Sequence, residues 1–255
     1  MKRREFLRTS LAASALTGVS HGNLPALAAE PANATNREYY DLRAYRLKSG
    51  ANHDLLDGYL EKAALPALNR LGVKSVGVFN EMEPKDGTAV WVLIPYPSLD
   101  SFATVTARIN ADEEYQKAGA QYLQTPKSEP GFERIDSWLL LAFAGMPRME
   151  LPALTREKKS RIFELRTYES HSEVKALKKV EMFNSGEIDV MREVELAPVF
   201  YGQAVIGPNL PHLTYMLSGA DRELHKKHWG GFGKHAVWKK LNGDPQYADT
   251  EQAVA

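Results

Sequence analysis

The spacing of apolar residues between positions 38 and 143 changes repeatedly between the period of a strand and that of a helix. Strands are predicted at 38–47, 73–80, 89–94 and 132–143. Helices are predicted at 53–71, where Pro66 should kink or end the helix, and from about Ser98 to Tyr122. The order β-α-β-β-α-β is the ferredoxin-like arrangement, an antiparallel sheet with both helices on one face.

A second copy of this pattern follows 123 residues later. Tyr-Asp-Leu-Arg-Ala-Tyr at 40–45 recurs as Phe-Glu-Leu-Arg-Thr-Tyr at 163–168. The same offset relates Ile109, Asp112, Tyr115 and Lys117 to Phe232, His235, Trp238 and Lys240. Two matches with one shared offset indicate a duplicated domain.

The second copy is expected to have a strand from Arg161, a helix at 172–194, strands at 197–206 and 212–217, and helical structure to Leu241. The offset carries Ala255 back to Phe132, so the fourth strand of this copy is expected to be missing. We therefore predict an α+β fold in which two tandem ferredoxin-like (βαββαβ) domains form a barrel within one chain. The predicted domains are 38–145 and 161–255, joined by a linker at 146–160. An open sheet edge on the second domain could mediate homo-oligomer formation.

The first strand of each copy carries the candidate ligand-binding residues Asp41, Arg43, Tyr45, Glu164, Arg166 and Tyr168. Alternation along a strand puts Tyr40, Leu42 and Ala44 on the opposite face, which we expect to meet the helices. The two acid–arginine–tyrosine sets would then face the barrel interior. They could form an ion-pair network that fixes how the sheets meet. Alternatively, the arginines could hold an anionic or carbonyl group while a tyrosine donates a hydrogen bond.

The first 28 residues resemble a twin-arginine signal peptide. Arg3-Arg4 is followed by one spacer, Phe6-Leu7 and Arg8, and Ala26-Leu27-Ala28 offers a cleavage site. The apolar stretch 11–19 is shorter than the roughly 20 residues that a membrane span needs. We therefore expect a flexible segment at 29–37 after cleavage, no membrane span, and a protein exported folded to the periplasm or beyond.

The amino-acid composition excludes several kinds of functional site. The chain has no cysteine, so it has no disulfide, thiolate metal site or cysteine nucleophile. Lys plus Arg and Asp plus Glu number 32 each, so no net charge attracts nucleic acid. His225, His228 and His235 are weak metal candidates, because nearby glycines weaken the helix and nearby lysines oppose a cation. No phosphate loop or Gly-x-Ser-x-Gly motif occurs. Neither a metal nor a cofactor is expected.

The two repeated motifs together resemble the NIPSNAP family of the dimeric α+β barrel superfamily, over about Glu38 to Tyr247. In that family the second motif usually contains Phe-x-x-Asp-Pro-x-Trp; Asp112 keeps the acid, whereas His235 replaces it in the second copy. The resemblance implies a barrel built from two such domains. It does not imply one activity, since related barrels include cofactor-free monooxygenases and haem-degrading enzymes.

Two functional hypotheses follow from the sequence. The first is non-catalytic binding of a small molecule or a protein partner through the barrel, which the lack of motif chemistry favours. The alternative is a cofactor-independent monooxygenase or isomerase that acts in the barrel interior, where Tyr, Arg and His would activate the substrate.

Overall fold

The computed structural model describes residues 36–48, 53–83 and 87–255. The predicted signal peptide and residues 29–35 of the predicted flexible segment lie outside this part. The chain separates into two units, Met1–Ala32 and Asn33–Ala255, and the fold described below is that of the second unit.

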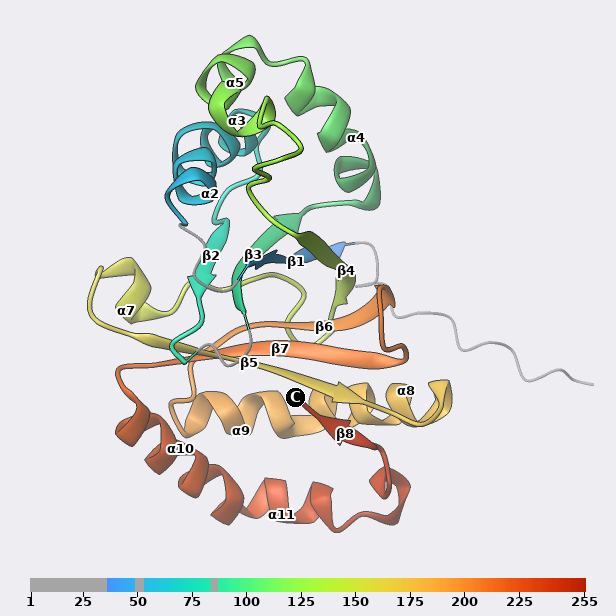
Figure 1. Ribbon diagram of the computed structural model, residues 1–255. Helices are drawn as coiled ribbons and strands as arrows, with labels where there is room; N and C mark the ends of the chain where they lie inside the picture. The colour runs from blue at the N-terminus through green and yellow to red at the C-terminus, as the bar shows by residue number, and fades with distance from the viewer. Residues whose placement is uncertain (1–35, 49–52, 84–86) are drawn as a thin grey trace, which may run out of the picture. The chain divides into compact units, whose positions relative to one another are not determined.

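The first copy has the predicted order of strands and helices (Figure 1). Its elements are β1 (Tyr39–Leu47), α2 (Asp54–Tyr59), α3 (Leu65–Arg70), β2 (Gly77–Asn80), β3 (Thr88–Tyr96), α4 (Leu99–Asn110), α5 (Glu113–Ala118), α6 (Ala120–Leu123) and β4 (Arg134–Ala142). A π turn at Leu60–Ala64 joins α2 to α3. Pro66 lies in the first turn of α3, where its missing N–H is tolerated, so the helical path continues to Arg70 instead of ending at the proline.

The second copy repeats these elements almost residue for residue. They are β5 (Ile162–Glu169), α8 (Glu173–Met182), α9 (Ile188–Glu193), β6 (Pro198–Ile206), β7 (His212–Gly219), α10 (Arg222–Lys234), α11 (Ala236–Asn242) and the two-residue β8 (Ala253–Val254). Even the π turn recurs, at Phe183–Glu187, which is 123 residues after the first. The predicted linker contains one short helix, α7 (Ala153–Arg156).

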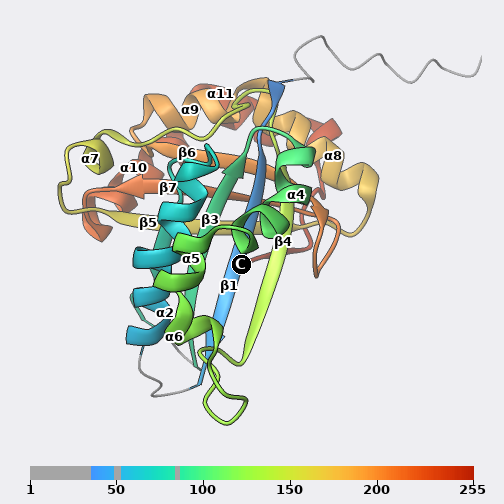
Figure 2. The same ribbon diagram turned by 90° about the horizontal axis from the view of Figure 1, so that it is seen from above.

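All the strands form one curled antiparallel sheet in the order β2-β3-β1-β4-β6-β7-β5-β8. The copies join where β4 pairs with β6, for example Leu141 with Gln203. Figure 2 shows the strands of the first copy running across those of the second. At the other side, where a fourth strand of the second copy would pair with β5, the described chain has only β8, which pairs with Tyr168 and Glu169 at the end of β5. The barrel is therefore joined along one seam and open along the other.

Helices cover the outer face of each half of the sheet, and the two inner faces meet in a shared core. The shared core contains Tyr40 and Leu42 from the first copy and Phe200 and Met216 from the second. By contrast, Tyr45 packs with the helices of the first copy. Tyr168 likewise packs with the helices of the second copy.

The faces predicted for the first strands are thus wrong in both copies. Tyr40 and Leu42 face the barrel interior, and the acid–arginine–tyrosine sets lie on the helix side. The physical reason is that both faces of this sheet are buried, so apolar character alone does not identify the face that meets the helices. The predicted ion pairs exist, but they do not fix how the two halves meet.

Candidate functional site

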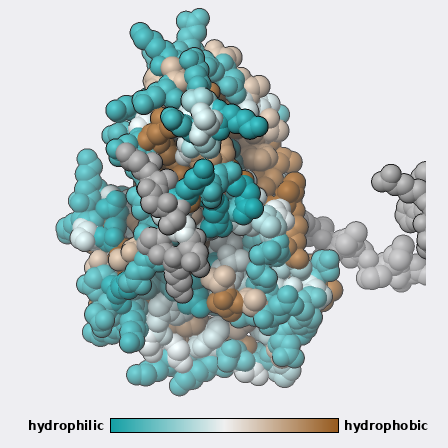
Figure 3. Space-filling model, in the orientation of Figure 1, coloured by the Kyte–Doolittle hydropathy of each residue, from teal (hydrophilic) through white to brown (hydrophobic). Residues whose placement is uncertain are grey.

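The space between the sheet and the helices of the first copy contains a pocket of about 320 Å³. Figure 2 shows α2, α4, α5 and α6 lying over β1, β3 and β4 around this space. On the face drawn in Figure 3, hydrophobic surface is visible beside these helices, whereas the surface over α10 and α11 is mostly hydrophilic. The polar and aromatic residues that line the pocket are Arg43, Tyr45, Tyr59, Tyr96, Thr106, Asn110, Tyr115, Tyr122 and Phe132. Its volume is at the lower end of the roughly 300–1,000 Å³ range of small-molecule sites.

Arg43 is held in a fixed position at this pocket. Its Nε donates to Asp41 Oδ2 at 2.7 Å, and Asp41 Oδ1 accepts from Ser137 Oγ at 2.7 Å. Burial lowers the pKa of Arg43, but the Asp41 carboxylate outweighs burial and raises it, so the guanidinium stays charged. Asp41 is buried, whereas the Arg43 side chain retains 29% of its exposure. Asp41 therefore fixes the position of the Arg43 guanidinium, which remains accessible from the pocket.

Tyrosine hydroxyls supply further hydrogen-bond donors. The Tyr59 and Tyr115 hydroxyls lie 3.0 Å apart, and the rings of Tyr59 and Tyr122 stack at 3.9 Å. The buried Tyr96 hydroxyl has no hydrogen-bond partner within the described chain. Burial raises the pKa of Tyr45 and of Tyr96, so both phenols keep their protons at neutral pH. A pocket with one cation and several phenols suits a ligand that carries a hydrogen-bond acceptor.

Arg43 and Tyr45 were predicted from the sequence, whereas most of the other residues that line the pocket were not. Tyr59, Tyr96, Tyr115 and Tyr122 come from three helices and a strand, and only the fold brings them together. The repeat itself contains a signal that the second copy differs from the first at this position. Extending the offset of 123 to the helices aligns Thr106 with Trp229, a substitution of a small side chain by the largest one.

In the second copy, Trp229 occupies the place above the equivalent arginine. The Arg166 guanidinium lies 4.8 Å from the centre of the Trp229 ring. Trp229 Nε1 donates to Glu164 Oε2 at 2.8 Å, and His225 Nε2 lies 2.9 Å from the same oxygen. Burial raises the pKa of Glu164, but the hydrogen bonds from His225 and Trp229 outweigh burial and lower it. Glu164 is therefore ionised, and His225 donates to it.

The other predicted residues have separate partners. Tyr168 shares a hydrogen bond with Tyr215 at 2.8 Å. His228 Nδ1 lies 2.9 Å from the Glu195 carbonyl oxygen, and His235 Nε2 lies 3.1 Å from Glu193 Oε2. In the part of the chain that is described, no three side chains of the metal-binding types form a group that could hold an ion. Across these same residues, no helix has the length and apolar character of a membrane span.

Part of the chain is similar to a known protein family. Residues 40–142 match the NIPSNAP family model. This NIPSNAP match covers the copy that contains the Arg43 pocket. No curated protein matches the chain.

Two solved structures show the same fold over most of the chain. A proposed monooxygenase from Fusobacterium nucleatum is similar with a TM-score of 0.52 and 10% identity, over 86% of this chain and 90% of that one. A proposed monooxygenase from Lactobacillus acidophilus is similar with a TM-score of 0.54 and 9% identity, over 86% and 91%. A NIPSNAP domain protein of Burkholderia xenovorans aligns with 43% of this chain and 99% of its own, with a TM-score of 0.35 and 18% identity.

Proposed function

We propose that the first copy binds a small planar molecule with an anionic or carbonyl oxygen, and that Arg43 is its anchor. The observation that carries this proposal is the charged, half-buried guanidinium at a tyrosine-lined pocket. The ring system of the ligand would contact Tyr59 and Tyr122, whose stacked rings form one wall. Its oxygen would accept hydrogen bonds from Arg43 and from the unpartnered hydroxyl of Tyr96.

A second candidate function is cofactor-independent oxygenation of the bound molecule. It is supported by the shared fold with two proposed monooxygenases and by the donor-rich pocket. Arg43 and a tyrosine would stabilise an anionic form of the substrate, which is electron-rich enough to react with O₂ directly. Fold similarity does not by itself establish a reaction, so binding is the primary proposal.

Calorimetric titration of the chain with 1-naphthoate and 1,4-naphthoquinone tests the proposal. We expect one bound molecule per chain. Arg43→Gln should weaken binding roughly 10- to 100-fold, because a hydrogen bond to a charged group contributes about 1.5–3 kcal/mol. Thr106→Trp should abolish binding, since it imports the side chain that covers the arginine in the second copy. Oxygen uptake with a naphthalene hydroquinone, measured on the same variants, separates oxygenation from binding alone.

Arg166→Gln is the matched control, because Arg166 has the same place in its strand but lies under Trp229. We expect it to leave the affinity unchanged. Equal losses in the Arg43 and Arg166 variants, or unchanged binding in a folded Thr106→Trp protein, would contradict the proposal. Thr106 is exposed, so this variant should keep its thermal stability.

We also propose that this binding takes place outside the cytoplasm. The support is the Arg3-Arg4-x-Phe6-Leu7 pattern followed by Ala26-Leu27-Ala28. Cell fractionation tests it: replacing Arg3 and Arg4 by lysine should retain the protein in the cytoplasm, and unchanged export would refute the proposal.

A further inference from the structure

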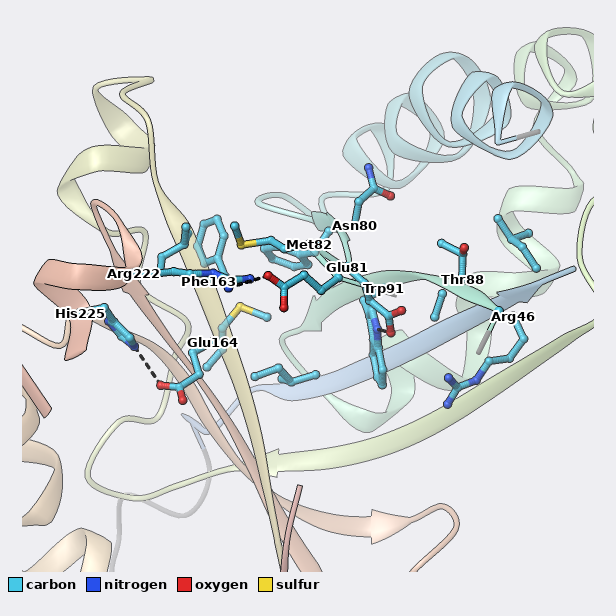
Figure 4. Close-up of a pocket in the computed structure, with 18 of the residues that line it drawn as sticks. Arg46, Asn80, Glu81, Met82, Thr88, Trp91, Phe163, Glu164, Arg222 and His225 are labelled. Atoms are coloured by element: carbon cyan, nitrogen blue, oxygen red, sulfur yellow. Dashed lines mark hydrogen bonds and ion pairs between the residues drawn. The ribbon is translucent and has the colours of Figure 1, made fainter. Parts of the chain in front are cut away.

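A larger cavity, of about 1150 Å³, lies at the open seam of the barrel, away from the Arg43 pocket. It is bounded by β2, β3 and the start of β4 on the first copy and by β5 and α10 on the second (Figure 4). In the described chain β2 ends one side of the sheet and β8 the other, and β8 pairs only with the end of β5. The cavity therefore lies between two edges of the sheet that do not pair with each other.

Side-chain contacts between the two copies bridge this seam and close it into a cavity. The rings of Phe79 and Phe163 meet edge to face at 4.9 Å. Arg222 Nη1 lies 2.7 Å from Glu83 Oε1 and links α10 to the residues after β2. A peptide strand that paired with both open edges would have to break these contacts. A small molecule would not.

Aromatic and aliphatic side chains form one wall of the cavity. Phe79, Trp91, Phe163 and Leu165 line it and also belong to, or pack against, the core between the two inner faces. Each of these side chains is only half-buried. A hydrophobic ligand would therefore be stabilised by removing this apolar surface from water.

Charge differs between the two ends of the cavity. At one end, Arg46 and Arg134 both bind Asp136, at 2.9 Å each, and Glu133 adds a further acid. The two positive and two negative charges at this end cancel.

At the α10 end, Arg222 pairs with Glu83, and His225 binds Glu164. Lys226 also lines this end and has no ion-pair partner among the described residues. In Figure 4, Glu81 lies between the two ends, where its carboxylate accepts a hydrogen bond from Trp91 Nε1 at 3.0 Å. It would repel an anion from the middle of the cavity. Among the lysines and arginines that line the cavity, Lys226 is thus the one that no acid of the described chain pairs.

We propose that the seam cavity binds a long-chain carboxylate, with its hydrocarbon tail along the aromatic wall and its head group at Lys226. This is a second ligand site, chemically distinct from the Arg43 pocket, and it does not depend on the function proposed for that pocket.

Titration of the full chain with dodecanoate and with dodecanol tests this proposal. Both should bind, and dodecanoate should bind more tightly. Lys226→Gln should weaken dodecanoate roughly three- to tenfold and leave dodecanol unchanged, because only the carboxylate loses a charged partner. Lys227→Gln is the matched control, since this neighbouring lysine does not line the cavity. Glu81→Gln keeps an acceptor for Trp91 and should strengthen dodecanoate binding.

Filling the cavity gives an independent test. Leu165→Trp, or Ile162→Trp at the rim if the first variant does not fold, should weaken both ligands at least tenfold. Thr106→Trp should change neither, which separates this site from the Arg43 pocket. Equal effects of the Lys226 and Lys227 variants would overturn the proposal. So would undiminished binding in a filled variant. Self-association at the seam with no dodecanoate binding would show that a strand of a second copy occupies it.

Discussion

The two copies use the space between sheet and helices in opposite ways. In the first copy, Thr106 leaves a pocket beside Arg43. In the second copy, Trp229 covers Arg166 and hydrogen-bonds to Glu164. Since the strands carry the same motif, the difference comes from the helices. After duplication, a copy can keep its backbone and its arginine while one helix residue decides whether the arginine is accessible.

The same contrast extends deeper into the helix layer. Lys179 and Glu187 form a buried ion pair at 3.5 Å in the second copy, and Glu251 also binds Lys179, at 2.7 Å. The offset of 123 places Leu56 and Ala64 at the positions equivalent to Lys179 and Glu187. The first copy is therefore apolar where the second is charged. At a further pair of equivalent positions the acidic and basic residues are exchanged. Arg70 binds Asp112 in the first copy, and Glu193 binds His235 in the second.

The largest expected effect comes from breaking the buried pair. At pH 8, above the pKa of Glu187, Lys179→Leu should destabilise the protein by about 3–5 kcal/mol, because it leaves the Glu187 carboxylate buried without its cation. The double variant Lys179→Leu, Glu187→Ala imports both residues of the first copy and should recover much of that loss. Urea unfolding measures both values. A double variant no more stable than the single one would show that the pair does not act as a unit.

The element order and the duplication could be predicted from the sequence, because periodicity and a repeated motif are local signals. The orientation of the first strands could not. Tyr40 and Leu42 were as suitable for a helix layer as for the interior between two sheets, and both environments exist here. The candidate site was predicted in part: Arg43 and Tyr45 line the pocket, but Tyr96 and Tyr122 reach it only through the fold. The seam cavity depends on contacts between the copies, such as Phe79 with Phe163, which no single-copy pattern contains.

The substitution Trp229→Thr in the second copy is the reverse of Thr106→Trp in the first. Trp229→Thr should uncover Arg166 and raise the number of bound 1-naphthoate molecules from one to two per chain. It should also cost about 2–3 kcal/mol of stability, less than the loss of a fully buried tryptophan, because Trp229 is only half-buried. Calorimetric stoichiometry measures the first effect and urea unfolding the second. A folded variant that still binds one molecule would mean that more than Trp229 closes the second copy.

The smallest effect is a pH dependence that comes from Glu187 of the second copy. Burial raises the pKa of Glu187 to about 7, above its ordinary value of 4.5, so the folded state holds this proton more tightly than the unfolded state does. The resulting stability is complete below about pH 4.5 and is lost as the pH rises through 7. Burial lowers the pKa of His212, which has the opposite effect: stability is lost as the pH falls.

The Glu187 contribution must therefore be measured as a difference between two proteins. Between pH 5 and 8, the unfolding free energy of the native chain should fall by about 2 kcal/mol relative to that of Glu187→Gln. His212 cancels in this comparison because both proteins contain it. Parallel curves for the two proteins would show that Glu187 is ionised throughout this range. The Lys179 ammonium and Glu187 would then be a fully charged pair, and the first copy's apolar residues would be its uncharged equivalent.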